Sequence, residues 1–225
     1  MKKIIDIFRR WLIFHKNVGY QLKDESPSEY ETLKIQPTPN PQAFQFILNK
    51  PILNYGSIHY NSAEEAQNDP FSNAVFEIFG VETIFLKENF ITVTKSPVVS
   101  WNIVIPQIEK AIVMFLKFYE TQRKKSEIFS PKVKEGPSEF TPDEFLQFPE
   151  DQKKRIIETI FDYGIRPALA RDGGDVALIA VQGTTIQVHF QGACGKCPSS
   201  TRGTLQFIEN MIKENLHSEL KLEAI

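Results

Sequence analysis

The chain has 225 residues, with 26 Lys and Arg against 28 Asp and Glu, so its formal net charge is −2 with four neutral His. This balance argues against a nucleic-acid-binding protein, which usually presents a basic face that displaces counterions. No stretch of the sequence approaches the roughly 18 uninterrupted apolar residues of a membrane helix, so a membrane partner is not expected either. The length suits one large domain or two small ones.

Residues 1–34 are expected to form an amphipathic leader outside the folded domains. Apolar residues recur with helical spacing from Ile4 to Leu12, and basic residues outnumber a single acid, Asp6, over the first 20 positions. A basic amphipathic segment is typical of a transit peptide, but serine is missing from the first 20 positions. We therefore expect a bacterial cytoplasmic protein, with the mitochondrial matrix as the alternative.

Residues 35–120 are predicted to fold as a small α+β domain. The alternation between Phe44 and Leu48 has the period of a strand. Asp69-Pro70 predicts a helix start, with Asp as N-cap and Pro as the first helical residue. The apolar face of that helix is expected to continue to Phe79, and Gly80 to end it.

The second half of this domain is predicted to contain a hairpin and a longer helix. Residues 83–86 and 90–94 are strand-like and are separated by a short turn, and residues 101–119 have the apolar spacing of an amphipathic helix. No group of residues here suggests a catalytic site. His59 stands alone in the sequence and is expected to be a surface or packing residue.

Residues 121–148 are predicted to be a flexible, charged linker. The segment mixes prolines with charged residues such as Arg123 to Lys125, a composition that buries too little apolar area to offset its ordering entropy. One short helical turn is expected after Thr141-Pro142. As a flexible coil the linker would span roughly 30 Å, which would allow the flanking domains to reorient.

Residues 149–225 are predicted to form a second α+β domain of α-β-β-α type. A helix with one apolar face is expected over residues 156–165, and the two glycines of Arg171 to Asp175 break it. Residues 176–181 and 184–190 read as an antiparallel hairpin with one buried face and one wet face. His189 falls on the wet face, where a role as a ligand is not expected.

The only two cysteines of the chain, Cys194 and Cys197, form a C-x-x-C motif just before the last predicted helix. Pro198 suits the first position of that helix, which places Cys197 at or near its N-cap. The positive end of a helix and the neighbouring Lys196 stabilise thiolates, and thiolates are the ligands that soft metals prefer. A two-residue gap lets both sulfur atoms converge on one metal centre.

Spacing alone leaves the chemistry of this motif open. A thiol–disulfide oxidoreductase also places C-x-x-C between a strand and a helix, but early in its domain, whereas here only 28 residues follow Cys197. A structural zinc site needs four ligands, and one chain supplies two. Two chains together would supply four cysteines, which suits zinc and an iron–sulfur cluster equally.

Both predicted domains resemble the Nfu-type iron–sulfur cluster carriers. The second domain resembles the NifU C-terminal domain through Arg166-Pro167, Asp172-Gly173-Gly174-Asp175 and Gly192-Ala193-Cys194-Gly195-Lys196-Cys197-Pro198-Ser199-Ser200. The first resembles the Nfu N-terminal domain through Thr38-Pro39-Asn40-Pro41, Phe79-Gly80-Val81 and Phe90-Ile91-Thr92-Val93-Thr94-Lys95. One departure is that Thr204-Leu205 follow one position later than is usual in the family, after Gly203.

The resemblance implies a carrier rather than an enzyme. It implies that a 4Fe-4S cluster bridges two protomers in a homodimer, with Cys194 and Cys197 of each as the metal ligands. It also implies that the cluster comes from an upstream assembly scaffold and passes to apo iron–sulfur acceptor proteins by ligand exchange. The alternative from a different class is a redox module that uses the same C-x-x-C as a thiol–disulfide oxidoreductase.

Overall fold

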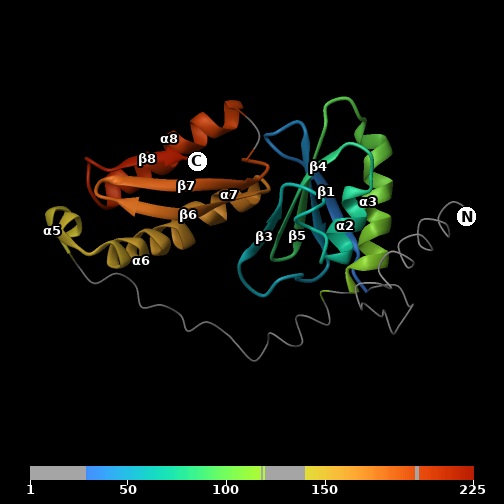
Figure 1. Ribbon diagram of the computed structural model, residues 1–225, viewed down its shortest axis with the longest axis horizontal. Coiled ribbons are helices and arrows are strands. Elements are labelled where there is room, and N and C mark those ends of the chain that lie inside the picture. Colours follow the sequence, from blue (N-terminus) through green and yellow to red (C-terminus); the bar gives the residue numbers. More distant parts are fainter. Residues whose placement is uncertain (1–28, 118, 120–139, 196–197) are drawn as a thin grey trace, which may run out of the picture.

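The computed structural model describes residues 29–117, 119, 140–195 and 198–225, and these form two α+β domains side by side (Figure 1). The leader stripe from Ile4 to Leu12, most of the predicted linker and Cys197 lie outside the described residues. Each domain has its own hydrophobic core. No helix in the described part is long and apolar enough to cross a membrane.

The N-terminal domain is built on an antiparallel sheet with the strand order β1-β2-β5-β4-β3. Its strands are β1 (Thr32–Pro37), β2 (Ala43–Leu48), β3 (Ser57–Tyr60), β4 (Val81–Lys87) and β5 (Phe90–Lys95). The predictions of β2, β4 and β5 are confirmed. The edge strands β1 and β3 were not predicted, and β1 begins inside the stretch 1–34 that was expected to form the leader.

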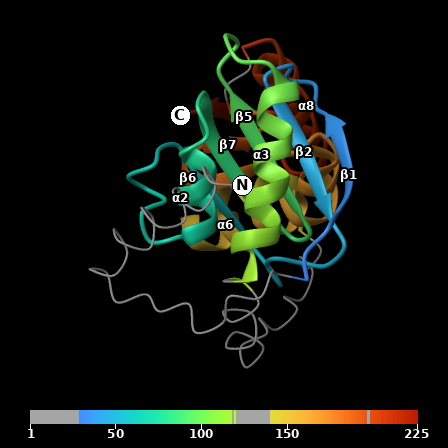
Figure 2. The same ribbon diagram turned by 90° about the vertical axis from the view of Figure 1, so that its right-hand side faces the viewer.

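The two faces of this sheet are covered by different parts of the molecule. Ile91 and Val93 of β5 belong to the core under α2 (Pro70–Phe76) and α3 (Trp101–Phe115). Figure 2 shows these helices in front of the sheet and the C-terminal domain behind it. Thr92 points to the other face and is also buried, because the C-terminal domain packs there.

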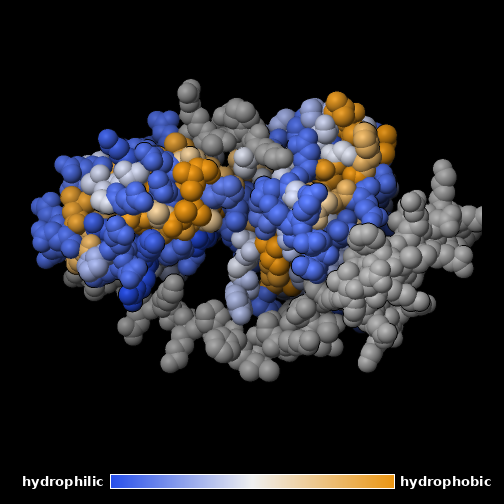
Figure 3. Space-filling model, in the orientation of Figure 1, coloured by the Kyte–Doolittle hydropathy of each residue, from blue (hydrophilic) through white to orange (hydrophobic). Residues whose placement is uncertain are grey.

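Helix α2 begins as predicted and ends earlier than predicted. The carboxylate of Asp69 caps it by accepting a hydrogen bond from the backbone N–H of Phe71, at 3.1 Å. The helix stops at Phe76, so Phe79 does not join its apolar face and is 81% exposed. Figure 3 shows hydrophobic residues at this end of the domain, where the loop between β5 and α3 exposes Val98.

The C-terminal domain packs helices against a three-stranded sheet with the order β6-β7-β8. Its elements are α6 (Glu150–Ile160), the π-helical turn η2 (Phe161–Ile165), α7 (Arg166–Arg171), β6 (Gly174–Gln182), β7 (Thr185–Gly192), α8 (Pro198–Asn215) and β8 (Lys221–Ala224). The predicted hairpin and last helix are confirmed. Strand β8 extends the predicted α-β-β-α order and pairs with β7 in parallel.

The end of the predicted linker is folded. Thr141 starts α5 (Pro142–Gln147) with a capping box, in which its hydroxyl and the carboxylate of Glu144 satisfy backbone N–H groups reciprocally. Phe145 of this helix is fully buried in the C-terminal core. The short helical turn expected after Thr141-Pro142 is therefore confirmed. The composition of the segment predicted a flexible linker around it, but Phe145 is buried by residues of the C-terminal domain rather than by its own segment.

We predict that Asp69 makes the stability of the N-terminal domain decrease as the pH rises above about 4. Burial raises the pKa of Asp69, and hydrogen bonds from the hydroxyls of Ser72 and Tyr119 only partly offset this. The folded domain therefore keeps this proton to a higher pH than the unfolded chain, and the stability from protonated Asp69 is lost as the pH passes its folded pKa.

In an Asp69→Asn variant the side chain at this position does not titrate. The free energy of unfolding of the variant, relative to that of the unmodified protein, should therefore increase between pH 3 and pH 7. Urea unfolding followed by the fluorescence of Trp101 measures this, with Trp11 replaced by Phe in both proteins. A difference that does not change with pH contradicts the prediction.

Candidate functional site

Cys194 lies in the loop that joins β7 to α8, as the sequence predicts. It is only 5% exposed and packs with the apolar side chains of the C-terminal core. The loop turns tightly, because the N–H of Gly195 donates to the carbonyl of Gly192 at 3.1 Å. Pro198 is the first residue of α8, so Cys197, itself outside the described residues, directly precedes an 18-residue helix.

Glycines provide the room that the Cys194 side chain occupies. A Cβ atom on Gly174 would lie 2.5 Å from the Sγ atom of Cys194, closer than real contacts allow. Gly192 has φ = +64°, and its Cβ would lie 2.5 Å from the carbonyl oxygen of Gly173. Larger residues at these positions would displace either the thiol or the strand end.

The N-terminal domain contacts the backbone immediately before Cys194. The side-chain amide of Asn40 donates to the carbonyl of Ala193 at 3.3 Å. The N–H of Gly192 donates to Nδ1 of His59, also at 3.3 Å, and the Nε2 atom of His59 lies 3.0 Å from Oδ1 of Asn61. His59 was expected to be a surface or packing residue, and the structure places it at the domain interface.

The turn that carries Gly173 and Gly174 is a second contact surface for the same domain. The hydroxyl of Thr92 donates to the carbonyl of Gly173 at 2.7 Å, and the amide of Gln45 donates to the carbonyl of Ala170 at 3.0 Å. The sequence predicted that these glycines break the preceding helix. The structure adds that their backbone carries an interdomain contact.

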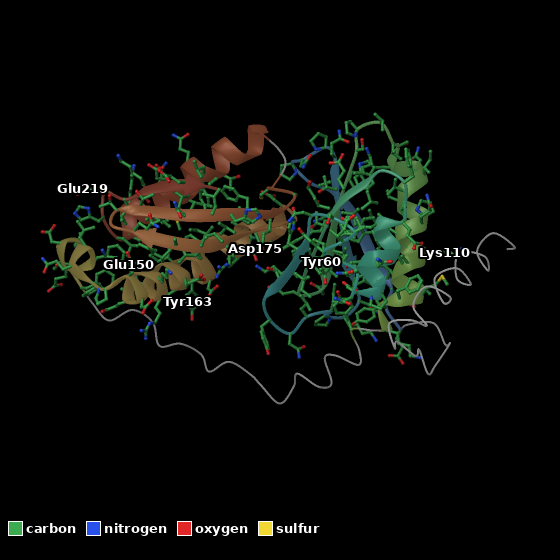
Figure 4. All side chains as sticks on the ribbon, viewed as in Figure 1. Tyr60, Lys110, Glu150, Tyr163, Asp175 and Glu219 are labelled. Carbon is green, nitrogen blue, oxygen red and sulfur yellow. The ribbon has the colours of Figure 1, made fainter. Side chains whose placement is uncertain are left out.

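Asp175, which ends this turn, forms a buried ion pair across the interface. Its carboxylate lies 2.8 Å from Nζ of Lys87, and both side chains are about nine-tenths buried. Figure 4 shows Asp175 at the end of β6 that faces the other domain. Removing one partner of such a pair usually costs about 3–5 kcal/mol, because the other charge stays buried and uncompensated.

Arg166 holds the same region together within the C-terminal domain. It donates to the carbonyl of Val176 and to the carboxylate of Glu158, at 3.2 and 2.6 Å, and its Nε lies 3.6 Å from Asp175. Burial opposes its charge, but the hydrogen bonds that Arg166 donates to the carboxylates of Glu158 and Asp162 outweigh burial and raise the pKa of Arg166. The guanidinium therefore stays charged beside the ion pair.

A cleft of about 920 Å³ opens at the seam between the domains. Its charged lining residues are three bases, Lys87, Arg166 and Arg171, and three acids, Glu88, Asp162 and Asp175. Because these charges balance, the cleft favours no one sign of ligand charge. Cys194 does not line it.

Two of the histidines, His59 and His189, lie close together, but among the described residues no other metal ligands join them. The rings of His59 and His189 have centroids 6.4 Å apart, and Nδ1 of His189 is hydrogen-bonded to the carbonyl of Ile225. Among the described residues, no group of three or more His, Cys, Asp or Glu side chains could hold a metal ion. The predicted ligands are thus Cys194, placed in its loop, and Cys197, which the described residues do not include.

Sequence comparisons match both domains. A family model described as "Scaffold protein Nfu/NifU N terminal" matches residues 33–118, and one described as "NifU-like domain" matches residues 157–223. The mitochondrial NifU-like protein 4 of Arabidopsis thaliana is 30% identical over 191 residues, covering 84% of this chain and 64% of that protein. The human mitochondrial NFU1 iron-sulfur cluster scaffold homolog is 30% identical over 188 residues, covering 83% and 69%.

The chain thus spans about two thirds of the length of the curated relatives that it matches. Among solved structures, protein SAV1430 from Staphylococcus aureus is 27% identical, covering 36% of this chain and 96% of that protein, with a TM-score of 0.33. The NifU-like protein from Saccharomyces cerevisiae is 18% identical, covering 47% and 87%, with a TM-score of 0.34. At these TM-scores, family membership rests on the sequence matches.

We predict that Gly174→Ala destabilises the C-terminal domain by about 1–3 kcal/mol, because the new methyl group overlaps the thiol of Cys194. Gly203→Ala is the matched control. Gly203 lies in α8 and has open space around it, so alanine there should stabilise the helix by up to about 1 kcal/mol. Thermal unfolding of both full-length variants measures the two effects. A Gly174→Ala variant that melts at the same temperature as the unmodified chain would show that the thiol does not occupy the space over Gly174.

Proposed function

The chain belongs to the Nfu family of iron–sulfur cluster scaffold proteins, and from this premise we propose that it carries a 4Fe-4S cluster and transfers it to apo-proteins. The cluster is cargo in this proposal, so no substrate bond is turned over and the protein is a carrier rather than an enzyme. The observation that carries the proposal is the position of the C-x-x-C motif, between the end of β7 and the start of α8, in a chain of this family.

The proposed ligands are Cys194 and Cys197. An 18-residue helix begins one residue after Cys197, and the N–H groups and partial positive charge of a helix N-terminus favour thiolates. Glycines at positions 192 and 195 keep the loop free of bulk. A large anionic cluster could therefore approach the backbone closely.

We propose that two copies of the chain share one cluster. Each copy has only two cysteines, and a 4Fe-4S cluster takes four thiolates, so a homodimer supplies a complete set. In transfer, each thiolate of an acceptor protein forms an iron–sulfur bond as one bond to the carrier breaks. No electrons are exchanged, and the released cysteine takes up a proton.

The partners in this proposal are an upstream assembly scaffold and apo iron–sulfur proteins. The curated relatives named above are mitochondrial, which favours the mitochondrial matrix over the bacterial cytoplasm that the leader composition suggested. In either compartment glutathione and thioredoxin keep thiols reduced, which a cluster-binding C-x-x-C requires.

We expect both Cys194→Ser and Cys197→Ser to abolish cluster binding, because either change removes two of the four thiolates from the dimer. Anaerobic reconstitution with iron and sulfide, followed by native mass spectrometry, is the measurement. The unmodified chain should give a dimer with the added mass of four irons and four sulfides. Gly203→Ala, which leaves both cysteines in place, should bind as the unmodified chain does.

Full cluster occupancy in Cys197→Ser would overturn the assignment of the ligands. A colourless monomer that takes up no iron and reduces protein disulfides would instead support the thiol–disulfide oxidoreductase. Nuclearity is read from the same spectra, since a 2Fe-2S cluster adds about half the mass.

A further inference from the structure

The N-terminal domain binds the C-terminal domain at the two segments that surround Cys194. One segment is the turn with Gly173, whose carbonyl accepts a hydrogen bond from Thr92. The other is the end of β7, where the backbone is hydrogen-bonded to Asn40 and His59. The ring of Phe85 also packs there, since a Cβ on Gly192 would lie 2.8 Å from it. The domain interface and the base of the cysteine loop are therefore the same surface.

In this docked arrangement Cys194 is turned inward. Its side chain is 5% exposed, and its Sγ lies over Gly174, inside the C-terminal core. A thiolate that bridges to a second molecule has to face outward. The backbone at Gly192 and Ala193 is the stretch that would have to rotate, and it is hydrogen-bonded to His59 and Asn40.

We propose that the N-terminal domain is an intramolecular cover for the cysteine loop, with Asn40 and His59 as its positioning residues. While the domain is docked, Cys194 stays buried. When the domain undocks, the loop is free to turn outward and the thiol becomes accessible. Docking and metal binding by Cys194 therefore exclude each other.

The composition of the interface supports reversible docking. The hydrogen bonds and the ion pair across the interface are polar contacts made by Gln45, Thr92 and Lys87, and the ring of Phe85 lies beside them on the same face. Polar interfaces of this kind are typical of domains that separate.

Separate cores make undocking possible without unfolding. Most buried apolar residues form two clusters, one in each domain, so neither core is opened when the interface separates. Phe85 and Phe90, which are buried on the interface face, belong to neither cluster. Linkage then gives the direction of the coupling. A cluster that binds only the undocked form must favour undocking, and a change that weakens docking must favour the cluster by the same factor.

The test measures the reactivity of Cys194 directly, in full-length protein with Cys197→Ser so that Cys194 is the only thiol. Thr92→Arg places a large charged side chain in the interface, while the fold of the N-terminal domain does not depend on the Thr92 hydroxyl. We expect alkylation of Cys194 by iodoacetamide to become faster by about tenfold or more, because local opening sets the rate at a buried group. Gln107→Arg is the matched control, since Gln107 is exposed on α3.

A second variant covers the case in which Thr92→Arg fails to fold. Thr92→Val keeps the side-chain volume and removes only the hydrogen bond to Gly173, so a smaller increase in the same direction is expected. Small-angle scattering of each variant should show a larger radius of gyration wherever alkylation is faster. Alkylation of folded variants at the rate of the Gln107→Arg control would overturn the proposal.

This inference rests on the proposed function only for what Cys194 binds. With both cysteines present, Thr92→Arg should take up the cluster faster than the Gln107→Arg control during anaerobic reconstitution. Faster alkylation with no cluster in any variant would contradict the proposed function and leave the cover in place. Cluster uptake in every variant at one rate would contradict the cover and leave the proposed function standing.

Discussion

The close approach of two backbone segments, around Gly173-Gly174 and around Gly192, is the constraint on which the candidate site depends. The N–H of Ala193 donates to the carbonyl of Gly173 at 3.1 Å, and the cysteine side chain fits only because Gly174 has no Cβ. The same absence of side chains lets Phe85 reach Gly192. Packing inside one domain and packing between domains are thus set by the same few atoms.

The interface contains both neutral hydrogen bonds and a buried ion pair, and the two kinds of contact contribute differently to the stability of the docked state. A hydrogen bond between neutral groups typically contributes about 0.5–1.5 kcal/mol, since each partner would otherwise bond to water. The buried pair of Lys87 and Asp175 contributes little net stability but makes a mismatched arrangement costly. Such a surface specifies one docked orientation and still permits separation.

Local patterns predicted the elements, and contacts distant in the sequence decided how they are used. The alternation in β2 and β7 and the cap at Asp69 depend on neighbouring residues, so they could be recognised. The four-residue strand β3 has too short a pattern, and Phe145 is buried by residues outside its own segment. The site was predicted only as far as its cysteines. Asn40 bonds to Ala193 across 153 positions, and no local signal reports such a contact.

The π-helical turn η2 makes the interface sensitive to chain length. Residues Phe161–Ile165 hold one more residue than an α-helical turn would, between α6 and Arg166. Each residue turns a helix by about 100°, so deleting one here would rotate Arg166 relative to α6 and away from Val176. Insertions and deletions at this turn would therefore alter the surface beside Asp175.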